Sequence, residues 1–186
     1  MQWSKTKSTL ESFLCEKLKG RIELHATVYR KFHDRPARVW ITFDKEEILS
    51  ASDVTFQVHR EKLYRQMIES RKVSSAAEAQ PGDSLNRQEY NKAFEQSEEV
   101  MVNESIFESY HLYEPFMRYP SLSIEDAMNS ENVIIVGLAM FDRRLGKRRL
   151  RMMETNDRSH PFVEHCYKIR CRIEGMNMER VNETHL

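Results

Sequence analysis

The sequence predicts an α+β fold, in which a small antiparallel β-sheet of two or three strands with helices precedes a mainly helical C-terminal half. Three observations predict it. Two early stretches, RIELHATVYR and RVWITFD, alternate apolar and polar side chains as half-buried strands do. Most of the chain after residue 86 repeats its apolar residues at helical spacing instead. A small, polar stretch with a Pro-Gly pair separates the two parts and favours a loop.

The N-terminal part begins with a predicted helix over residues 5–19, which Ser4 caps and Gly20 ends. Two strands follow, at 21–30 and 38–44. The link between them is long for a tight hairpin but suits two adjacent antiparallel strands.

The next stretch has an ambiguous pattern. Val54, Phe56 and Val58 alternate like a strand, whereas the apolar residues after residue 60 are spaced as in a helix. We expect a short third strand over 54–59 that passes into a helix near residue 60.

The Pro-Gly stretch divides the chain into two halves, which we expect to pack as one compact domain. The predicted organisation is a sheet half at 1–71, a flexible loop at 72–85, a helical half at 86–175 and a tail at 176–186.

The helical half starts with a strongly acidic helix over 86–101 and an aromatic-rich helix over 104–118. Ser123 and Asp126 then fit a capping box for a short helix. The stretch ENVIIVGLAMFDRRL is apolar almost all round, which favours a buried helix and leaves a buried strand as the alternative.

The last predicted helix runs from Pro161 to Gly175, with Ser159 as its cap. Its apolar residues recur at intervals of three and four, and Cys166 belongs to this stripe.

The net charge is zero but unevenly spread. Residues 76–131 hold twelve acidic and three basic side chains, and residues 132–186 hold seven acidic and eleven basic ones. The chain therefore lacks the overall basic field that is typical of nucleic-acid-binding proteins, although local patches of both signs remain possible.

The sequence favours a cytoplasmic protein. Three cysteines are an odd number and argue for a reducing compartment rather than a disulfide framework. The start, MQWSKTKSTLESF, has no apolar core of a signal peptide, and the longest apolar run, VIIVGLAMF, is too short to span a membrane.

The acidic middle of the chain offers one candidate binding surface. Glu95, Glu98 and Glu99 fall on one predicted helix, and Tyr110 and Tyr113 fall on the next. Carboxylates attract a basic partner and speed its association, and tyrosines are common at interface centres. The same residues are compatible with a solvated helix face and with core packing, so both interpretations stay open.

A second candidate is the stretch FDRRLGKRRLRMM. On one helix its apolar residues, Met152 among them, share an arc that faces the core. The opposite arc carries a basic patch that consists of Arg143, Arg144, Lys147, Arg148 and Arg151. Gly146 weakens a continuous helix here and would split the patch between a helix end and a new first turn. The favoured interpretation is a solvated face, or cations paired with the acidic helices of 86–131; a clamp for phosphates or an acidic partner is the alternative.

Histidines and cysteines gather in HPFVEHCYKIRC, where His160 and His165 have a spacing that zinc sites use. Cys166 and Cys171 are five residues apart and point in different directions on a helix. We therefore expect buried structural thiols here and no metal site.

No catalytic residue can be assigned from the sequence. Adjacent helical residues such as His165 and Cys166 do not face each other, and His25 is expected beside Trp40 or Thr42 as an exposed cross-strand pair. The chain has five glycines and none of the common phosphate-binding or nucleophile motifs. We expect no cofactor and lean against an enzyme.

Several stretches, WSKTKSTLESFLCEKLKGR and WITFDKEEI near the start and DRRLGKRRL and HPFVEHCYKIRC near the end, resemble a group of small uncharacterised bacterial cytosolic proteins. The resemblance implies a cytosolic protein and supplies no activity and no site residues.

These observations predict a non-catalytic protein-binding or regulatory module that recognises a protein partner through its acidic–aromatic surface, which suits a basic partner. Binding of nucleic acid or phosphate through the basic residues 143–151 is the alternative, and we expect no membrane association.

Overall fold

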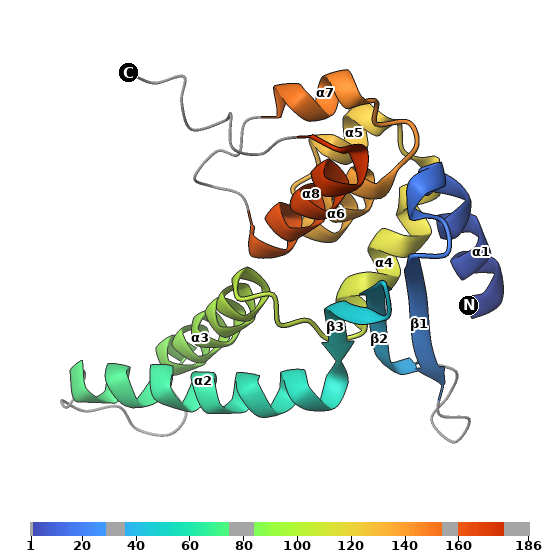
Figure 1. Cartoon of the computed structure of the whole chain (residues 1–186). Helices are drawn as coiled ribbons and strands as arrows, with labels where there is room; N and C mark the ends of the chain where they lie inside the picture. Colours follow the sequence, from blue (N-terminus) through green and yellow to red (C-terminus); the bar gives the residue numbers. More distant parts are fainter. Residues whose placement is uncertain (1, 29–35, 75–83, 154–159, 177–186) are drawn as a thin grey trace, which may run out of the picture.

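A computed structural model describes residues 2–28, 36–74, 84–153 and 160–176 (Figure 1). It has the predicted α+β architecture. The elements in order are α1 (Trp3–Phe13), η1 (Glu16–Leu18), β1 (Ile22–Val28), β2 (Pro36–Phe43), β3 (Glu46–Ser52), α2 (Asp53–Ser74), α3 (Ser84–Asn103), α4 (Tyr110–Arg118), η2 (Tyr119–Ser121), α5 (Ile124–Met128), α6 (Val133–Phe141), α7 (Lys147–Met152) and α8 (Pro161–Glu174).

The three strands form one antiparallel sheet in the order β1-β2-β3. The predicted alternation is confirmed, because Leu24, Ile41 and Leu49 pair across the sheet and are buried on its core face. On the opposite face, His25 stacks on Trp40 at 5.1 Å between ring centroids, and its Nε2 lies 3.0 Å from Thr42 Oγ1. This cross-strand pair was also predicted.

The predicted position of the third strand is wrong. Asp44 and Lys45, with φ of 51° and 72°, make a two-residue turn, so β3 begins directly after β2. The chain has therefore left the sheet before Val54. Residues 54–59 form the first turns of α2, where Phe56 is fully buried and Val54 is 70% exposed.

The first helix is shorter than the predicted 5–19. It begins after Gln2, with Ser4 inside it, and ends at Phe13. A tertiary contact explains the early end, because the backbone N–H of Cys15 donates to the carbonyl of Phe141 at 2.9 Å. Gly20 does adopt the left-handed conformation, with φ of 72°.

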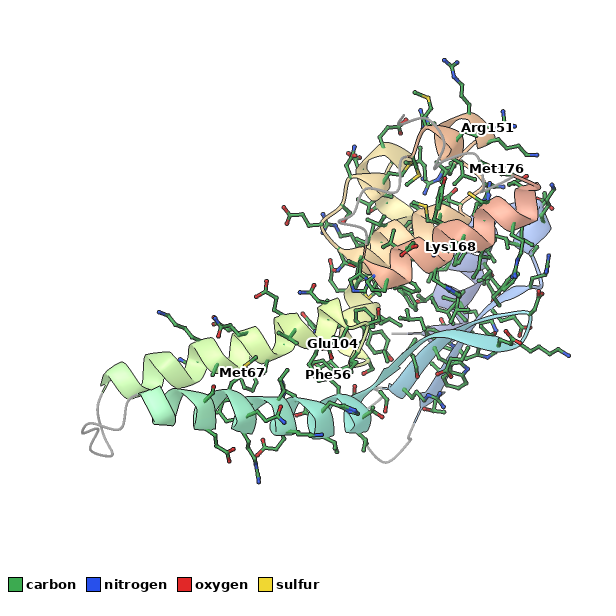
Figure 2. All side chains as sticks on the ribbon, turned by 60° about the vertical axis from the view of Figure 1, so that its left-hand side comes forward. Phe56, Met67, Glu104, Arg151, Lys168 and Met176 are labelled. Carbon is green, nitrogen blue, oxygen red and sulfur yellow. The ribbon has the colours of Figure 1, made fainter. Side chains whose placement is uncertain are left out.

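The helices α2 and α3 form a hairpin that projects from the rest of the molecule (Figures 1 and 2). Much of the predicted loop 72–85 lies outside the described residues; α2 reaches Ser74 and α3 starts at Ser84. The predicted helix 86–101 is contained in α3.

The helix predicted over 104–118 starts only at Tyr110. The preceding residues turn back toward the sheet, where Phe107 makes a bridge with Ala51 and its carbonyl accepts the N–H of Ser52. The short helix α5 is confirmed, with the Ser123 hydroxyl accepting the N–H of Asp126.

The apolar stretch from Val133 is a helix, α6, and most of it is buried. The last helix also starts and ends as predicted, at Pro161 and before Gly175, whose φ is 70°. Its N-cap is His160, whose ring accepts the N–H of Phe162; the predicted cap, Ser159, lies outside the described residues.

The basic stretch is not one continuous helix. The chain leaves α6 at Asp142, turns, and starts α7 at Lys147 with Gly146 as the N-cap. The expected break at Gly146 is confirmed, whereas the placement of Met152 on the buried arc is wrong, since it is 72% exposed.

One hydrophobic core joins the sheet to α1, α4, α6 and α8. Figure 1 shows α5, α6, α7 and α8 grouped at the end of the sheet that is remote from the α2–α3 hairpin. None of the helices in the described part of the chain has both the length and the apolar character needed to cross a membrane.

Candidate functional site

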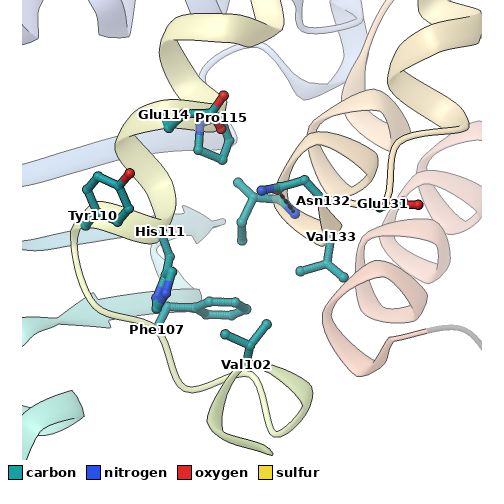
Figure 3. Close-up of a pocket in the computed structure, with 10 residues that line it drawn as sticks. Val102, Phe107, Tyr110, His111, Glu114, Pro115, Glu131, Asn132 and Val133 are labelled. Atoms are coloured by element: carbon teal, nitrogen blue, oxygen red, sulfur yellow. Dashed lines mark hydrogen bonds between the residues drawn. The ribbon is translucent and has the colours of Figure 1, made fainter. Parts of the chain in front are cut away.

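A pocket of about 340 Å³ lies where the end of α3 meets the starts of α4 and α6 (Figure 3). Its apolar lining comes from all three helices and the link before α4, and consists of Val102, Phe107, Pro115, Val133 and Ile134. These side chains give the pocket an apolar wall, a surface that suits aliphatic groups rather than charged ones.

The polar lining of the pocket is acidic and aromatic. Tyr110 is 66% exposed, and Glu114 follows it one turn later on the same face of α4. Glu131 contributes a second exposed carboxylate just before α6. The pairing of Glu114 is loose, with 3.9 Å between its Oε1 and Nη1 of Arg118. Two carboxylates and an aromatic ring are therefore available to a ligand.

His111 fixes α4 to the α2–α3 hairpin. Its Nδ1 accepts the backbone N–H of Glu108 at 3.2 Å, so the ring proton sits on Nε2, which donates to Oε1 of Glu98 at 3.0 Å. Its ring also makes an edge contact with Phe56 at 5.2 Å. Both ring nitrogens are thus engaged in holding the structure.

Asn132 fixes the opposite wall. Its Oδ1 accepts the N–H groups of Ile134 and Ile135, at 3.0 and 3.3 Å, and so caps α6. The negative charge of Glu131 at this end complements the positive end of the helix dipole.

The three glutamates predicted on α3 have different roles. Glu98 is bound to His111. Glu95 and Glu99 are exposed and form no ion pair with any residue that the structure describes. Because Glu95, Glu99 and Val102 recur at intervals of four and three, they share one face of α3, and Val102 lines the pocket.

The two predicted tyrosines also differ. Tyr110 lies at the pocket and is exposed, whereas Tyr113 is half-buried, and its hydroxyl has no hydrogen-bond partner in the described residues. Burial, with a smaller effect from the carboxylate of Asp53, raises the pKa of Tyr113 to about 12. Tyr113 therefore has a structural role, because its half-buried ring packs against the core beneath α4.

The predicted basic patch is divided by the fold. Arg144 is tied to the buried carboxylate of Asp142, with 2.7 Å between Nη2 and Oδ2, and it donates to the Leu122 carbonyl. The hydroxyl of Tyr119 donates to the same carboxylate at 2.5 Å. The hydrogen bond with Asp142 is the main reason that the pKa of Arg144 is raised. Arg144 is thus a structural residue.

Lys147 is also engaged, with 3.1 Å between its Nζ and Oε2 of Glu174. These carboxylate partners belong to the basic C-terminal segment, so the expected pairing with residues 86–131 is not observed for Arg144 or Lys147. It is observed for Arg149 of the same stretch, with 2.5 Å between its Nη2 and Oε1 of Glu125. The remaining members of the basic patch are exposed and have no ion pair with a described residue: Arg143, Arg148 and Arg151.

The histidines and cysteines of the last helix do not converge. His160 contacts the Val102 carbonyl through Nε2 at 2.6 Å, and His165 is exposed. Cys166 and Cys171 are buried free thiols, as predicted, and burial is the first cause of their raised pKa values. In the part of the chain that the structure covers, no three His, Cys, Asp or Glu side chains are grouped as metal ligands.

The sequence analysis missed most of the pocket, including Glu114, Glu131 and Asn132. Both glutamates lie in the acidic segment 76–131, and an Asn directly before an apolar run is an N-cap signal. Neither pattern indicates that α4 and the start of α6 face each other across a pocket.

The chain belongs to the SF0329 protein family, which it matches over residues 2–171. No curated protein and no solved structure matches it. The name of the family states no activity, so a function is inferred from the site itself.

Proposed function

We propose that this member of the SF0329 protein family is a non-catalytic protein-binding module that recognises a basic segment of a partner protein. The binding surface is the acidic face, which we define as Glu95 and Glu99 of α3 together with Tyr110, Glu114 and Glu131 at the pocket. The observation that carries the proposal is the exposure of Glu95 and Glu99 without ion pairs in the described structure, on the face of α3 that ends at the pocket.

The chemistry of the pocket suits an Arg or Lys side chain. The aliphatic stem packs on apolar residues such as Phe107 and Val133, and the charged end lies near Glu114 and Glu131. The exposed ring of Tyr110 adds a cation–π contact. Glu95 and Glu99 then attract further basic residues of the same segment and increase its association rate.

Two polar side chains of the pocket form their hydrogen bonds within the fold. His111 uses both ring nitrogens within the fold, and the side-chain oxygen of Asn132 caps α6. These two side chains are therefore used to hold the pocket in shape, and the exposed carboxylates of Glu114 and Glu131 are the groups left to bind a cation.

We further propose that the binding takes place in the cytoplasm. The three cysteines support this, because all are free and buried and none is placed in a disulfide.

Titration of a synthetic Arg-rich peptide with interspersed apolar residues, followed by fluorescence anisotropy, tests the proposal. We expect binding that weakens with salt, and the double variant Glu95→Lys/Glu99→Lys should lose about tenfold or more in affinity. Tyr110→Ala should also weaken binding, because it removes the ring at the pocket. Glu46→Lys, which reverses an exposed carboxylate on the sheet, is the control and should bind as the unmodified chain does.

Two results would contradict the proposal. One is peptide binding that is equally reduced by Glu46→Lys and by a single Glu99→Lys change, which would indicate a nonspecific response to net charge. The other is the absence of peptide binding together with salt-sensitive binding of single-stranded RNA or DNA, abolished by changing Arg143, Arg148 and Arg151 to Ala. That outcome would favour the alternative predicted from the basic patch.

A further inference from the structure

Three aromatic rings meet at the pocket, and their arrangement bears on which cation the pocket binds. The ring of His111 lies 6.2 Å from that of Phe107 and 6.3 Å from that of Tyr110, between ring centroids, at interplanar angles of 73° and 61°. Figure 3 shows Phe107 and His111 on one wall, with Asn132 and Val133 on the wall that faces them. Because His111 is steeply inclined to both of its neighbours, the rings form a corner rather than a flat stack.

This aromatic corner carries no positive charge of its own. Nδ1 of His111 accepts the N–H of Glu108, which requires the neutral form of the ring. None of the residues described as lining the pocket is Lys or Arg, and two of them, Glu114 and Glu131, are exposed carboxylates. The negative faces of aromatic rings attract a cation that lies against them. The pocket is therefore suited to a positive charge.

The interior of the pocket offers few hydrogen-bond acceptors to that cation. Both ring nitrogens of His111 are engaged, Oδ1 of Asn132 caps α6, and much of the remaining lining is hydrocarbon, as at Val102 and Val133. The two carboxylates are exposed to water. An unmodified lysine brings three N–H donors and an arginine five, and a donor that loses water without gaining an acceptor costs free energy. A cation without such donors avoids this cost.

We propose that the pocket binds a methylated ammonium group and prefers a methylated lysine side chain to an unmodified one. Methyl groups replace the N–H donors with C–H surface that packs against rings and aliphatic side chains, while the positive charge remains. Glu114 and Glu131 then stabilise this charge through space, without a direct hydrogen bond. The inference deepens the proposed function and rests on it for the source of the group, a lysine of the partner's basic segment.

The size of the pocket and the exposure of its rings agree with this ligand. The volume of about 340 Å³ is near the lower end of ligand sites, which range from about 300 to 1,000 Å³, and this suits the end of one side chain. Phe107 is 2% exposed and its backbone makes a bridge with Ala51, whereas Tyr110 is 66% exposed. Tyr110 is therefore the ring that can be changed without disturbing the core.

Three versions of one basic peptide test the inference by fluorescence anisotropy. They differ at a single position, which holds a lysine, a trimethylated lysine or an uncharged isostere with carbon in place of the nitrogen. We expect the trimethylated peptide to bind at least about fivefold more tightly than the lysine peptide. It should also bind more tightly than the isostere, which has the same shape but no charge.

Variants of Tyr110 connect this preference to the ring. Tyr110→Leu should remove most of the preference for the trimethylated peptide, because it keeps apolar surface and loses the aromatic face. Tyr110→Phe is the matched control and should keep the preference. The quantity compared is the ratio of the two affinities, since a general disturbance of the pocket would weaken both peptides equally.

Tetramethylammonium chloride, compared with sodium chloride at the same concentration, distinguishes a lysine side chain from a free ligand. Displacement of the trimethylated peptide by tetramethylammonium at lower concentration than by sodium would support the inference. A free ion that binds as tightly as the peptide would also support it and would assign the pocket to a small quaternary ammonium compound.

The outcomes separate this inference from the proposed function. Equal affinities for the lysine and trimethylated peptides, or for the trimethylated peptide and its isostere, would overturn the inference and leave peptide binding intact. Binding of tetramethylammonium without binding of any of the peptides would support the inference and overturn the proposed function. Binding of neither would overturn both.

Discussion

Arg170 stabilises the turn between α6 and α7, which forms the middle of the basic stretch FDRRLGKRRLRMM. Its side chain is almost fully buried, and its guanidinium donates to the carbonyls of Asp142 and Leu145 at 3.1 and 3.0 Å. Its Nε lies 3.3 Å from Oε1 of Glu174, which is also paired with Lys17 and Lys147. A buried arginine thus binds carbonyl groups at the end of α6 and in the turn that follows it, and Glu174 balances its charge.

Replacement of Glu174 by Gln should destabilise the protein at neutral pH by about 1–3 kcal/mol, because it leaves a buried cation without its counter-charge. Burial alone would raise the pKa of Glu174, but the hydrogen bonds from Lys147 and Lys17 and the charge of Arg170 hold this pKa below its ordinary value. A carboxylate whose pKa is lower in the folded than in the unfolded state stabilises the folded protein at pH values above the unfolded pKa. This contribution is lost as the pH falls through the folded pKa.

Urea unfolding at pH 7 and at a pH below 4 measures this effect. The difference between Glu174→Gln and the unmodified chain should be large at pH 7 and shrink in acid. Glu164→Gln, on the same helix in an exposed pair with Lys168, should change stability by less than about 0.5 kcal/mol at either pH. An equal effect of both substitutions would show that Glu174 has no special role.

Among the helices, α6 shows how packing against a neighbouring helix can require a residue that does not favour a helix. It carries Gly137 at its centre, where glycine lowers helix propensity by about 1 kcal/mol relative to alanine. The structure shows the reason, because a Cβ at this position would overlap the ring of Phe162 on α8. Gly137 therefore allows the close approach of α6 and α8, two buried helices of the core.

Gly137→Ala should destabilise the protein by about 1–3 kcal/mol, although alanine is the better helix former. Phe162 is only 3% exposed and has little space into which to move. The free energy of unfolding in urea measures the change. Gly146→Ser is the control, since nothing lies within 4 Å of its added Cβ and serine is a good N-cap. A Gly137→Ala protein as stable as the parent would mean that the helices can separate without cost.

The whole molecule combines one well-packed body with one thinly packed arm, which is the α2–α3 hairpin. The core cluster runs through the sheet, α1, α4, α6 and α8, whereas the α2–α3 hairpin beyond Phe56 buries few large side chains among those that the structure describes. Local stability follows burial, so the two parts should open with different free energies.

Hydrogen exchange should show this difference. At low protein concentration, the amides of α6 should exchange slowest, and those of α2 beyond Phe56 should exchange fastest among the long helices. Mass spectrometry of peptides from both regions measures the rates. An arm protected as strongly as α6 in dilute solution would contradict the prediction.

The order of the residues was enough to predict the fold class, the pairing of β1 with β2, the helical nature of most of the C-terminal half and the helix end at Gly175. These features depend on short-range rules of alternation, helical period and capping, which a linear pattern records. The sequence also shows where the acidic segment lies, but it does not show which of its carboxylates are without ion pairs.

The folded chain alone shows that Glu98 pairs with His111, that Arg144 and Lys147 are engaged within the protein, and that Glu114 and Glu131 meet at one pocket. It also placed β3 at Glu46–Ser52 and ended α1 at Phe13. Except for Arg144, whose partner Asp142 is two residues away, the partners are brought together by packing of segments that are distant in the chain or by a turn whose backbone overrides the apolar period. The free energy of such contacts depends on distances in space, about which the order of residues carries little information.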